Sequence, residues 1–209
     1  MSGTEHPSAF SEHRVTRQLE FDPDQSAVLV IDMLNDFLDP EGAMPLLEGR
    51  RLYEPIRRLL RAARESGARV IWICDEHLPT DREFEKRSVH CLQGSWGAEI
   101  VAELEPGDSE LRIPKTRYSG FFETDLDQLL RQTSINHLIL TGVVTNICVR
   151  STAHDAFFRD YRVTIPVECV AATSEREQES TLYDLDTHYG TVAGLEEVLA
   201  ILDGAQRRV

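Results

Sequence analysis

The sequence predicts an α/β protein, a three-layer α/β/α sandwich with a central, mainly parallel β-sheet. Two observations predict it. Continuous runs of apolar, mostly β-branched residues are typical of strands buried on both faces, as in parallel sheets. Segments with helical periodicity separate these runs, and strand–helix alternation builds right-handed βαβ units. With 209 residues, 41% of them hydrophobic, the chain is long enough to bury a full core.

The elements are expected in a regular order along the chain. Strands are expected at residues 27–31, 68–73, 137–144 and 161–166, with a shorter run at 110–113. Helices are expected at residues 53–66, 124–133, 146–159, 175–188 and 195–202. No repeat, low-complexity tract or linker divides the chain, so we expect an N-terminal arm at residues 1–20 and a single domain at residues 21–209.

Composition excludes several classes of partner. The formal net charge of -14 disfavours binding to nucleic acid or to an anionic membrane surface. No run approaches the roughly 18 apolar residues that a membrane span needs. The polar N-terminus has no apolar signal-peptide core, so we expect a cytoplasmic protein. The four cysteines form no CxxC pair and are expected to be free thiols in a reducing compartment.

Cys148 is the first candidate for chemistry. In parallel sheets, ligand sites form at the carboxyl ends of the strands. Cys148 follows the strand at 137–144 and opens a helix, where the helix dipole and unpaired N–H groups lower a thiol pKa and favour the thiolate. The same N–H groups can stabilise an oxyanion. The alternative is a small buried core residue, which is the commoner place for a free cysteine.

Asp32 and Lys115 are the candidate partners of Cys148. Asp32 ends an apolar strand, where a carboxylate is costly unless it is paired, and it could accept the thiol proton. Lys115 is one of only two lysines in a chain that otherwise uses arginine, and it would hold Asp32 ionised. The alternatives are a turn aspartate, with Asp36 competing for the role of base, and a solvated surface lysine. No histidine lies in these segments, so a Cys–Asp–Lys set is more natural than a Cys–His pair.

Three motifs together resemble the isochorismatase-like cysteine hydrolases, which include nicotinamidases, N-carbamoylsarcosine amidohydrolase and ureidoacrylate amidohydrolases. The motifs cover residues 30–37, residues 114–121 and residues 141–149. The resemblance implies a triad of Asp32 as base, Lys115 as cationic partner and Cys148 as nucleophile, which needs no cofactor. It also implies a cis peptide bond between Val143 and Val144, with the N–H groups of Val144 and Cys148 facing an oxyanion. Relatives form dimers or tetramers, so a homo-oligomer is expected.

A metal site is a second implication of the resemblance. Nicotinamidases bind a divalent ion through an Asp-x-His pair and a later His before a Cys, and Asp75, His77 and His90 match these positions. Such ligands suit zinc, iron or manganese. A fourth ligand is available among Asp81, Glu83 and Glu85, and the alternative is that the histidines only form hydrogen bonds. Nicotinamidases carry a Trp-Pro stretch before the second His, whereas residues 85–89 here are mostly charged, which disfavours nicotinamide itself.

The substrate pocket and the reaction complete the expectation. The residues expected to contact substrate are Phe37, Trp96, Tyr118, Phe121 and Asn146. The expected activity is hydrolysis of a C–N bond in a small amide or ureido compound through a Cys148 thioester. Alternatives are hydrolysis of a vinyl ether, as in isochorismatases that lack this cysteine, a non-catalytic binding module on the same fold, and a redox-sensing thiol.

Overall fold

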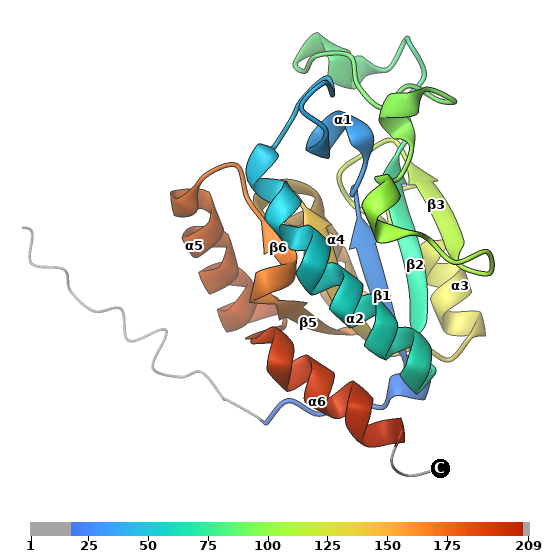
Figure 1. Cartoon of the computed structure of the whole chain (residues 1–209), viewed down its shortest axis with the longest axis vertical. Helices are drawn as coiled ribbons and strands as arrows, with labels where there is room; N and C mark the ends of the chain where they lie inside the picture. Colours follow the sequence, from blue (N-terminus) through green and yellow to red (C-terminus); the bar gives the residue numbers. More distant parts are fainter. Residues whose placement is uncertain (1–17, 207–209) are drawn as a thin grey trace, which may run out of the picture.

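The computed structural model describes residues 18–206, with side chains described up to residue 204. Most of the expected N-terminal arm therefore lies outside the described residues. Seven parallel strands form one sheet, and the expected sandwich is confirmed (Figure 1). The strands are β1 (Ser26–Ile31), β2 (Arg69–Asp75), β3 (Leu111–Lys115), β4 (His137–Val143), β5 (Arg162–Pro166), β6 (Val170–Ala171) and β7 (Thr191–Ala193).

The order of the strands places three strand ends side by side. The order is β3-β2-β1-β4-β5-β7, and the short β6 also pairs with β4. Ile31 at the end of β1 lies opposite Ile73 of β2 and Gly142 of β4, while Asp75 at the end of β2 lies opposite Lys115 of β3. All five expected runs are strands, but β6 and β7 were not expected, because two or three residues are too few to show a pattern.

Helices cover both faces of the sheet. They are α1 (Asn35–Leu38), α2 (Tyr53–Ser66), α3 (Leu126–Gln132), α4 (Arg150–Phe157), α5 (Glu175–Asp184) and α6 (Leu195–Gln206). Side chains of α2 and α6 pack with Val28 and Val30 on one face, and those of α3 and α4 pack with Leu29 and Ile31 on the other. Successive residues of β1 therefore face opposite layers, as the strand geometry requires.

The expected helix at 146–159 begins differently from the prediction. Residues Thr145–Val149 form a π-helical turn, and α4 follows it from Arg150. A single π-helical turn of this kind is rare and is frequently found at functional sites. The expected helix at 175–188 likewise ends in a π-helical segment, Leu185–Tyr189.

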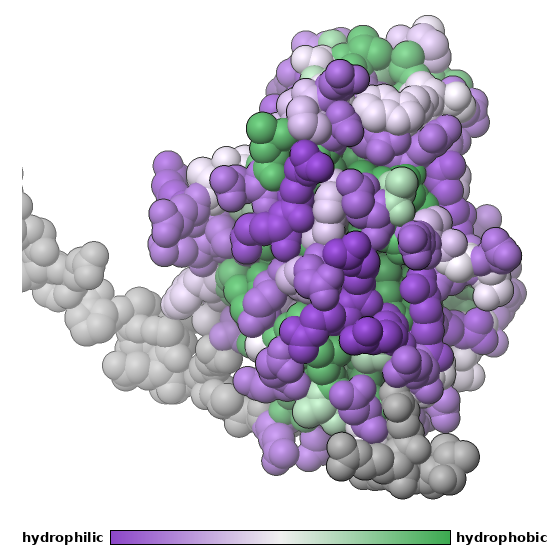
Figure 2. All heavy atoms as spheres, in the orientation of Figure 1, coloured by the Kyte–Doolittle hydropathy of each residue, from purple (hydrophilic) through white to green (hydrophobic). Residues whose placement is uncertain are grey.

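The outer face of the α2–α6 layer is hydrophilic. Figure 2 shows polar side chains over most of this face, in keeping with the exposed arginines along α2. Within residues 18–206, the structure contains no helix with the length and hydropathy needed to span a bilayer.

Candidate active site

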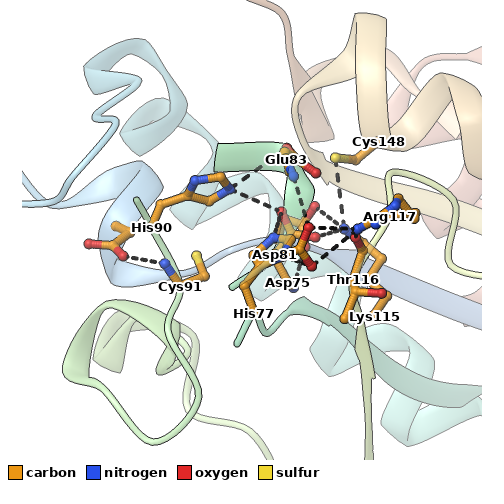
Figure 3. A network of polar contacts seen from close by, with 12 residues as sticks. Asp75, His77, Asp81, Glu83, His90, Cys91, Lys115, Thr116, Arg117 and Cys148 are labelled. Atoms are coloured by element: carbon orange, nitrogen blue, oxygen red, sulfur yellow. Dashed lines mark hydrogen bonds and ion pairs between the residues drawn. The ribbon is translucent and has the colours of Figure 1, made fainter. Parts of the chain in front are cut away.

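Three side chains meet at the carboxyl edge of the sheet. Asp32 directly follows β1, Lys115 is the last residue of β3, and Cys148 lies in the π-helical turn after β4. The Lys115 Nζ lies 2.8 Å from Asp32 Oδ2. It also lies 3.8 Å from Cys148 Sγ (Figure 3). The structure therefore brings together the three residues that the sequence placed at separate strand ends.

Asp32 is held in one orientation by backbone contacts. Its φ angle is +52°, a left-handed conformation that aspartate adopts more readily than most residues. Its N–H donates to the Ile73 carbonyl at 2.8 Å, and its Oδ1 accepts the Asp75 N–H at 2.9 Å. Since Oδ1 is engaged with the backbone, Oδ2 is the oxygen that faces Lys115.

Lys115 is a buried cation between two carboxylates. Only 2% of the residue is exposed, and its ammonium group pairs with both Asp32 and Asp75. Burial alone would lower the pKa of Lys115, but the two carboxylates and the thiol hold that pKa well above its ordinary value. The side chain is therefore a permanent positive charge at neutral pH, and it compensates the negative charge of its neighbours.

Cys148 is a protonated thiol at rest, which corrects the expectation of a stabilised thiolate. Burial raises the pKa of Cys148 well above its ordinary value, and the charges of Asp32 and Asp75 add to this while Lys115 opposes it. A helix dipole contributes about 0.3–1 kcal/mol, whereas desolvating a charge costs several kcal/mol, so burial dominates. A base is therefore needed to activate this thiol.

Asp32 has the protonation behaviour that such a base needs. Burial, followed by the charge of Asp75, raises the pKa of Asp32 to about 6, with Lys115 acting in the opposite direction. The carboxylate is thus mostly ionised at pH 7, and its basicity is higher than that of an ordinary aspartate. A base works best when its pKa lies near the working pH.

We expect kcat/KM for any substrate to fall about tenfold per pH unit below pH 6, because the protonated Asp32 cannot accept the thiol proton. Above pH 6 the base form dominates and the rate levels off. A pH–rate profile, with circular dichroism at each pH to check folding, measures this limb. A limb at the ordinary aspartate value, close to pH 4, would contradict the role given to Asp32.

The backbone beside Cys148 contains the expected cis peptide bond. It joins Val143 to Val144, as the resemblance implied. The preceding Gly142 has a φ angle of +103°, and a Cβ atom there would lie 2.0 Å from the carbonyl oxygen of Ile31. Only glycine fits at this position. The oxyanion role expected for the N–H groups of Val144 and Cys148 stays a prediction.

A second cluster lies next to the first and shares Asp75 with it. Asp75, His77 and His90 are buried, and one potential ligand atom from each lies within 4.8 Å of the others. Asp75 Oδ2 is 3.8 Å from His77 Nε2 and 3.9 Å from His90 Nε2. Figure 3 shows the two imidazoles near this carboxylate, and both belong to the long connection between β2 and β3.

The hydrogen bonds of both histidines leave their Nε2 atoms available. His90 Nδ1 lies 2.7 Å from the Ser88 carbonyl oxygen, which can only accept, so Nδ1 carries the proton. His77 Nδ1 lies 3.1 Å from Asp81 Oδ2, a carboxylate that orients a metal-binding imidazole in the same way. His77 Nε2 is buried without a hydrogen-bond partner among the described residues. Two imidazole nitrogens and a carboxylate oxygen thus converge with unused lone pairs.

A cavity of about 290 Å³ opens onto Cys148, Asp32 and Asp75. Its size suits a small ligand rather than a polymer. Of the residues expected to contact substrate, Phe37 and Tyr118 line it. The other lining residues are Met44, Pro45, Leu46, Glu83, Arg87, His90, Val143, Val144, Ile147 and Thr173.

Three residues expected at the substrate lie outside this cavity. Phe121 is buried in the core against Tyr161, and Trp96 is exposed on a short 3₁₀ turn over α1. The Asn146 side chain is engaged with Thr173, which lines the cavity in its place. The sequence shows an aromatic or amide side chain but not which way it points.

Comparison with known proteins agrees with this geometry. The isochorismatase domain model matches residues 26–197. The chain belongs to the isochorismatase family. The family predicted from the sequence motifs is therefore confirmed, and the chain is a hydrolase of this fold.

Solved structures of amide-cleaving enzymes are among its relatives. N-carbamoylsarcosine amidase from Thermoplasma acidophilum is 32% identical, with a TM-score of 0.76 over 82% of this chain and 97% of the other. Nicotinamidase from Bacillus subtilis is 30% identical, with a TM-score of 0.75 over 81% and 99%. Pyrazinamidase from Pyrococcus horikoshii, solved in complex with zinc, is 28% identical, with a TM-score of 0.77 over 81% and 99%. These comparisons confirm the predicted enzyme class, a hydrolase that acts on C–N bonds other than peptide bonds.

Proposed function

We propose that this protein is a cysteine amidohydrolase that cleaves the C–N bond of a small amide or ureido compound through a thioester on Cys148. The observation that carries the proposal is the meeting of a buried thiol, a carboxylate of raised pKa and a buried ammonium group at the wall of one small cavity. The thiol supplies the nucleophile, the carboxylate supplies the base that activates it, and the ammonium group supplies the compensating positive charge.

The first half of the reaction forms the thioester. Asp32 accepts the proton from Cys148 Sγ while the sulfur forms a bond to the substrate carbonyl carbon. Lys115 stabilises the sulfur and the Asp32 carboxylate before the transfer, because it lies within 4 Å of both. When the tetrahedral intermediate collapses, the C–N bond breaks and the nitrogen leaves with the proton held by Asp32.

The second half releases the product. Water attacks the thioester carbon, and Asp32 takes one of its protons. The C–S bond then breaks, the sulfur takes the proton that Asp32 holds, and the acid product leaves. The same carboxylate thus serves as base and then acid in each half of the reaction, which a pKa of about 6 permits near neutral pH.

The proposal is tested by incubating the protein with a panel of small amides and ureido acids and measuring ammonia release. Acid-quenched samples are analysed by mass spectrometry for an adduct on the peptide that contains Cys148. We expect one compound to release ammonia and to leave an acyl or carbamoyl group on Cys148. Turnover without any adduct under single-turnover conditions would argue against the covalent route.

We further propose that Asp75, His77 and His90 hold a divalent metal ion, of which zinc, iron and manganese suit these ligands best. The donor set fits, because two imidazole nitrogens and a carboxylate oxygen are buried together and His77 Nε2 has no other partner among the described residues. Glu83 Oε1, 3.9 Å from His90 Nε2, is available as a further oxygen ligand. A metal here would supply Lewis-acid polarisation of a substrate atom.

We expect about one zinc ion per chain after reloading chelator-treated protein, and a raised Tm in excess zinc, because the ion binds only the folded site. His77→Ala and His90→Ala should each lose this binding in calorimetry. His154→Ala, on α4 and outside the cluster, is the matched control and should bind zinc as before. Equal zinc binding by all the variants would refute the site.

Two further expectations from the sequence concern assembly and location. We infer a homo-oligomer, as a dimer or tetramer, and a cytoplasmic location. Exposed aromatic side chains at Phe157 and Phe158, at the end of α4, are consistent with a subunit contact.

A further inference from the structure

One arginine in the cavity is not used by the proposed chemistry. Arg87 is the only cationic side chain among the residues that line the cavity around Cys148, as far as the described chain shows. The other nearby cation, Lys115, has its charge taken up by Asp32 and Asp75. Any negatively charged part of a ligand in this cavity therefore has Arg87 as its available cationic partner.

Arg87 has no carboxylate partner, although carboxylates are abundant. The chain has 36 acidic and 22 basic residues, and neighbouring arginines are paired: Arg82 with Glu85, and Arg117 with Asp81. No ion pair of Arg87 within 4.0 Å occurs among residues 18–206. Glu83, the nearest acid along the chain that also lines the cavity, lies 3.9 Å from His90 Nε2 instead.

A neutral hydrogen-bond donor lies beside the guanidinium. Tyr118 also lines the cavity, and the charge of Arg87 lies close enough to lower its pKa. Burial, followed by the charge of Glu83, raises the pKa of Tyr118, so the phenol keeps its proton at neutral pH. A guanidinium with an adjacent O–H donor matches the needs of a carboxylate, which accepts several hydrogen bonds at once.

The rest of the cavity sets limits on the ligand. Apolar side chains form much of its wall, including Phe37, Leu46 and Ile147, and its volume of about 290 Å³ admits only a compact molecule. The overall negative charge of the protein does not exclude an anion, because exposed charges more than about 8 Å away are screened at physiological salt. Closer acids line the cavity itself: Asp32 and Asp75 are paired with Lys115, which leaves Glu83 as the carboxylate that a bound anion must avoid.

We propose that Arg87 and Tyr118 form a carboxylate subsite, so that the substrate is a short acid amide or ureido acid rather than an uncharged amide. This inference rests on the proposed function for the position of the scissile carbonyl at Cys148. It assigns Arg87 to substrate binding and selectivity and gives it no part in the proton transfers of Asp32.

The test uses pairs of compounds that differ only in the carboxylate. N-carbamoylglycine is compared with isobutylurea, and succinamate with 4-methylpentanamide, because a CH(CH₃)₂ group has nearly the shape of COO⁻. Binding is measured by calorimetry in the Cys148→Ala background, and kcat/KM is measured by ammonia release in the intact enzyme. Arg87→Met keeps the length of the side chain and removes its charge. Arg82→Met, on the same loop but paired with Glu85 and outside the cavity, is the control.

We expect the acid of at least one pair to bind about 10- to 100-fold more tightly than its neutral partner, as charge-assisted hydrogen bonds imply. Arg87→Met should remove this preference, mainly through KM, Arg87→Lys should restore part of it, and Arg82→Met should leave it intact. Absence of a preference, or a preference that survives Arg87→Met, overturns the inference.

The two proposals fail in different ways. An Arg87-dependent preference in binding without any ammonia release would leave the carboxylate subsite standing and overturn the amidohydrolase. Ammonia release from neutral amides with no dependence on Arg87 would leave the amidohydrolase standing and overturn the carboxylate subsite.

Discussion

Replacing Cys148 with alanine is expected to lower kcat/KM by roughly 10⁴-fold or more, the scale seen when a nucleophile is removed from an assembled site. The sulfur forms the covalent bond in the proposed route, and no other thiol can replace it. The described cysteines Cys74, Cys91 and Cys169 are at most 1% exposed, and burial raises the pKa of each. Ammonia release from the best substrate of the panel measures the loss.

The control for this prediction is Cys169→Ala. It also removes a buried thiol, but one that packs in the core with side chains of α2 and α6 and does not line the cavity. It should cost about 1 kcal/mol of unfolding free energy through lost packing and leave kcat/KM within a few-fold. If Cys148→Ala kept most of the activity, direct attack by water, as in relatives that cleave a vinyl ether, would become the better account.

Alkylation provides an independent view of the same residue. Because the Cys148 thiol is protonated at rest, iodoacetamide should label it slowly whenever Asp32 does not accept the thiol proton. The sequence had instead predicted a thiol with a lowered pKa, present as the thiolate, at a helix N-terminus. The sequence locates the thiol after a strand, but burial depends on the side chains that close over it, and these come from distant segments.

The ends of the strands could be predicted because an apolar run is visible in the few residues that form the strand. Asp32 stands out as a carboxylate at the end of an apolar run, and parallel pairing then brings it beside Lys115 and Cys148. The walls of the cavity were harder to predict. Met44, Pro45 and Leu46 line it from a loop after α1 whose path no periodic pattern encodes.

Arg87 illustrates the same limit for charged residues. In the sequence it is one of several charges at residues 85–89, and its neighbours give no sign that it differs from them. In the structure both arginines are exposed, but Arg82 is paired with Glu85, while Arg87 lines the cavity without an acid within 4.0 Å. Whether a charge is satisfied depends on distances across the fold, which the sequence does not contain.

Replacing Lys115 with methionine is expected to lower both activity and stability. Methionine fills a similar space, but two buried carboxylates, Asp32 and Asp75, lose the ammonium group that compensates them. Breaking a buried ion pair in this way costs about 3–5 kcal/mol. The matched control is Lys86→Met, since Lys86 is the other lysine of the chain and is exposed, so its loss should change the unfolding free energy by under about 0.5 kcal/mol.

The destabilisation should also depend on pH, with a sign that identifies its cause. Without Lys115, the pKa of Asp32 rises further above the unfolded value of 3.8. Burial and the charge of Asp75 still raise this pKa, and the ammonium group that lowered it is gone. The folded variant then binds a proton that the unfolded chain releases, so its stability is highest at low pH and falls as pH rises through this range. Urea unfolding in chelator at pH 5 and pH 8 should therefore show the larger deficit relative to wild type at pH 8. An equal deficit at both values would mean that Lys115 contributes packing rather than charge, and its role in holding Asp32 ionised would have to be given up.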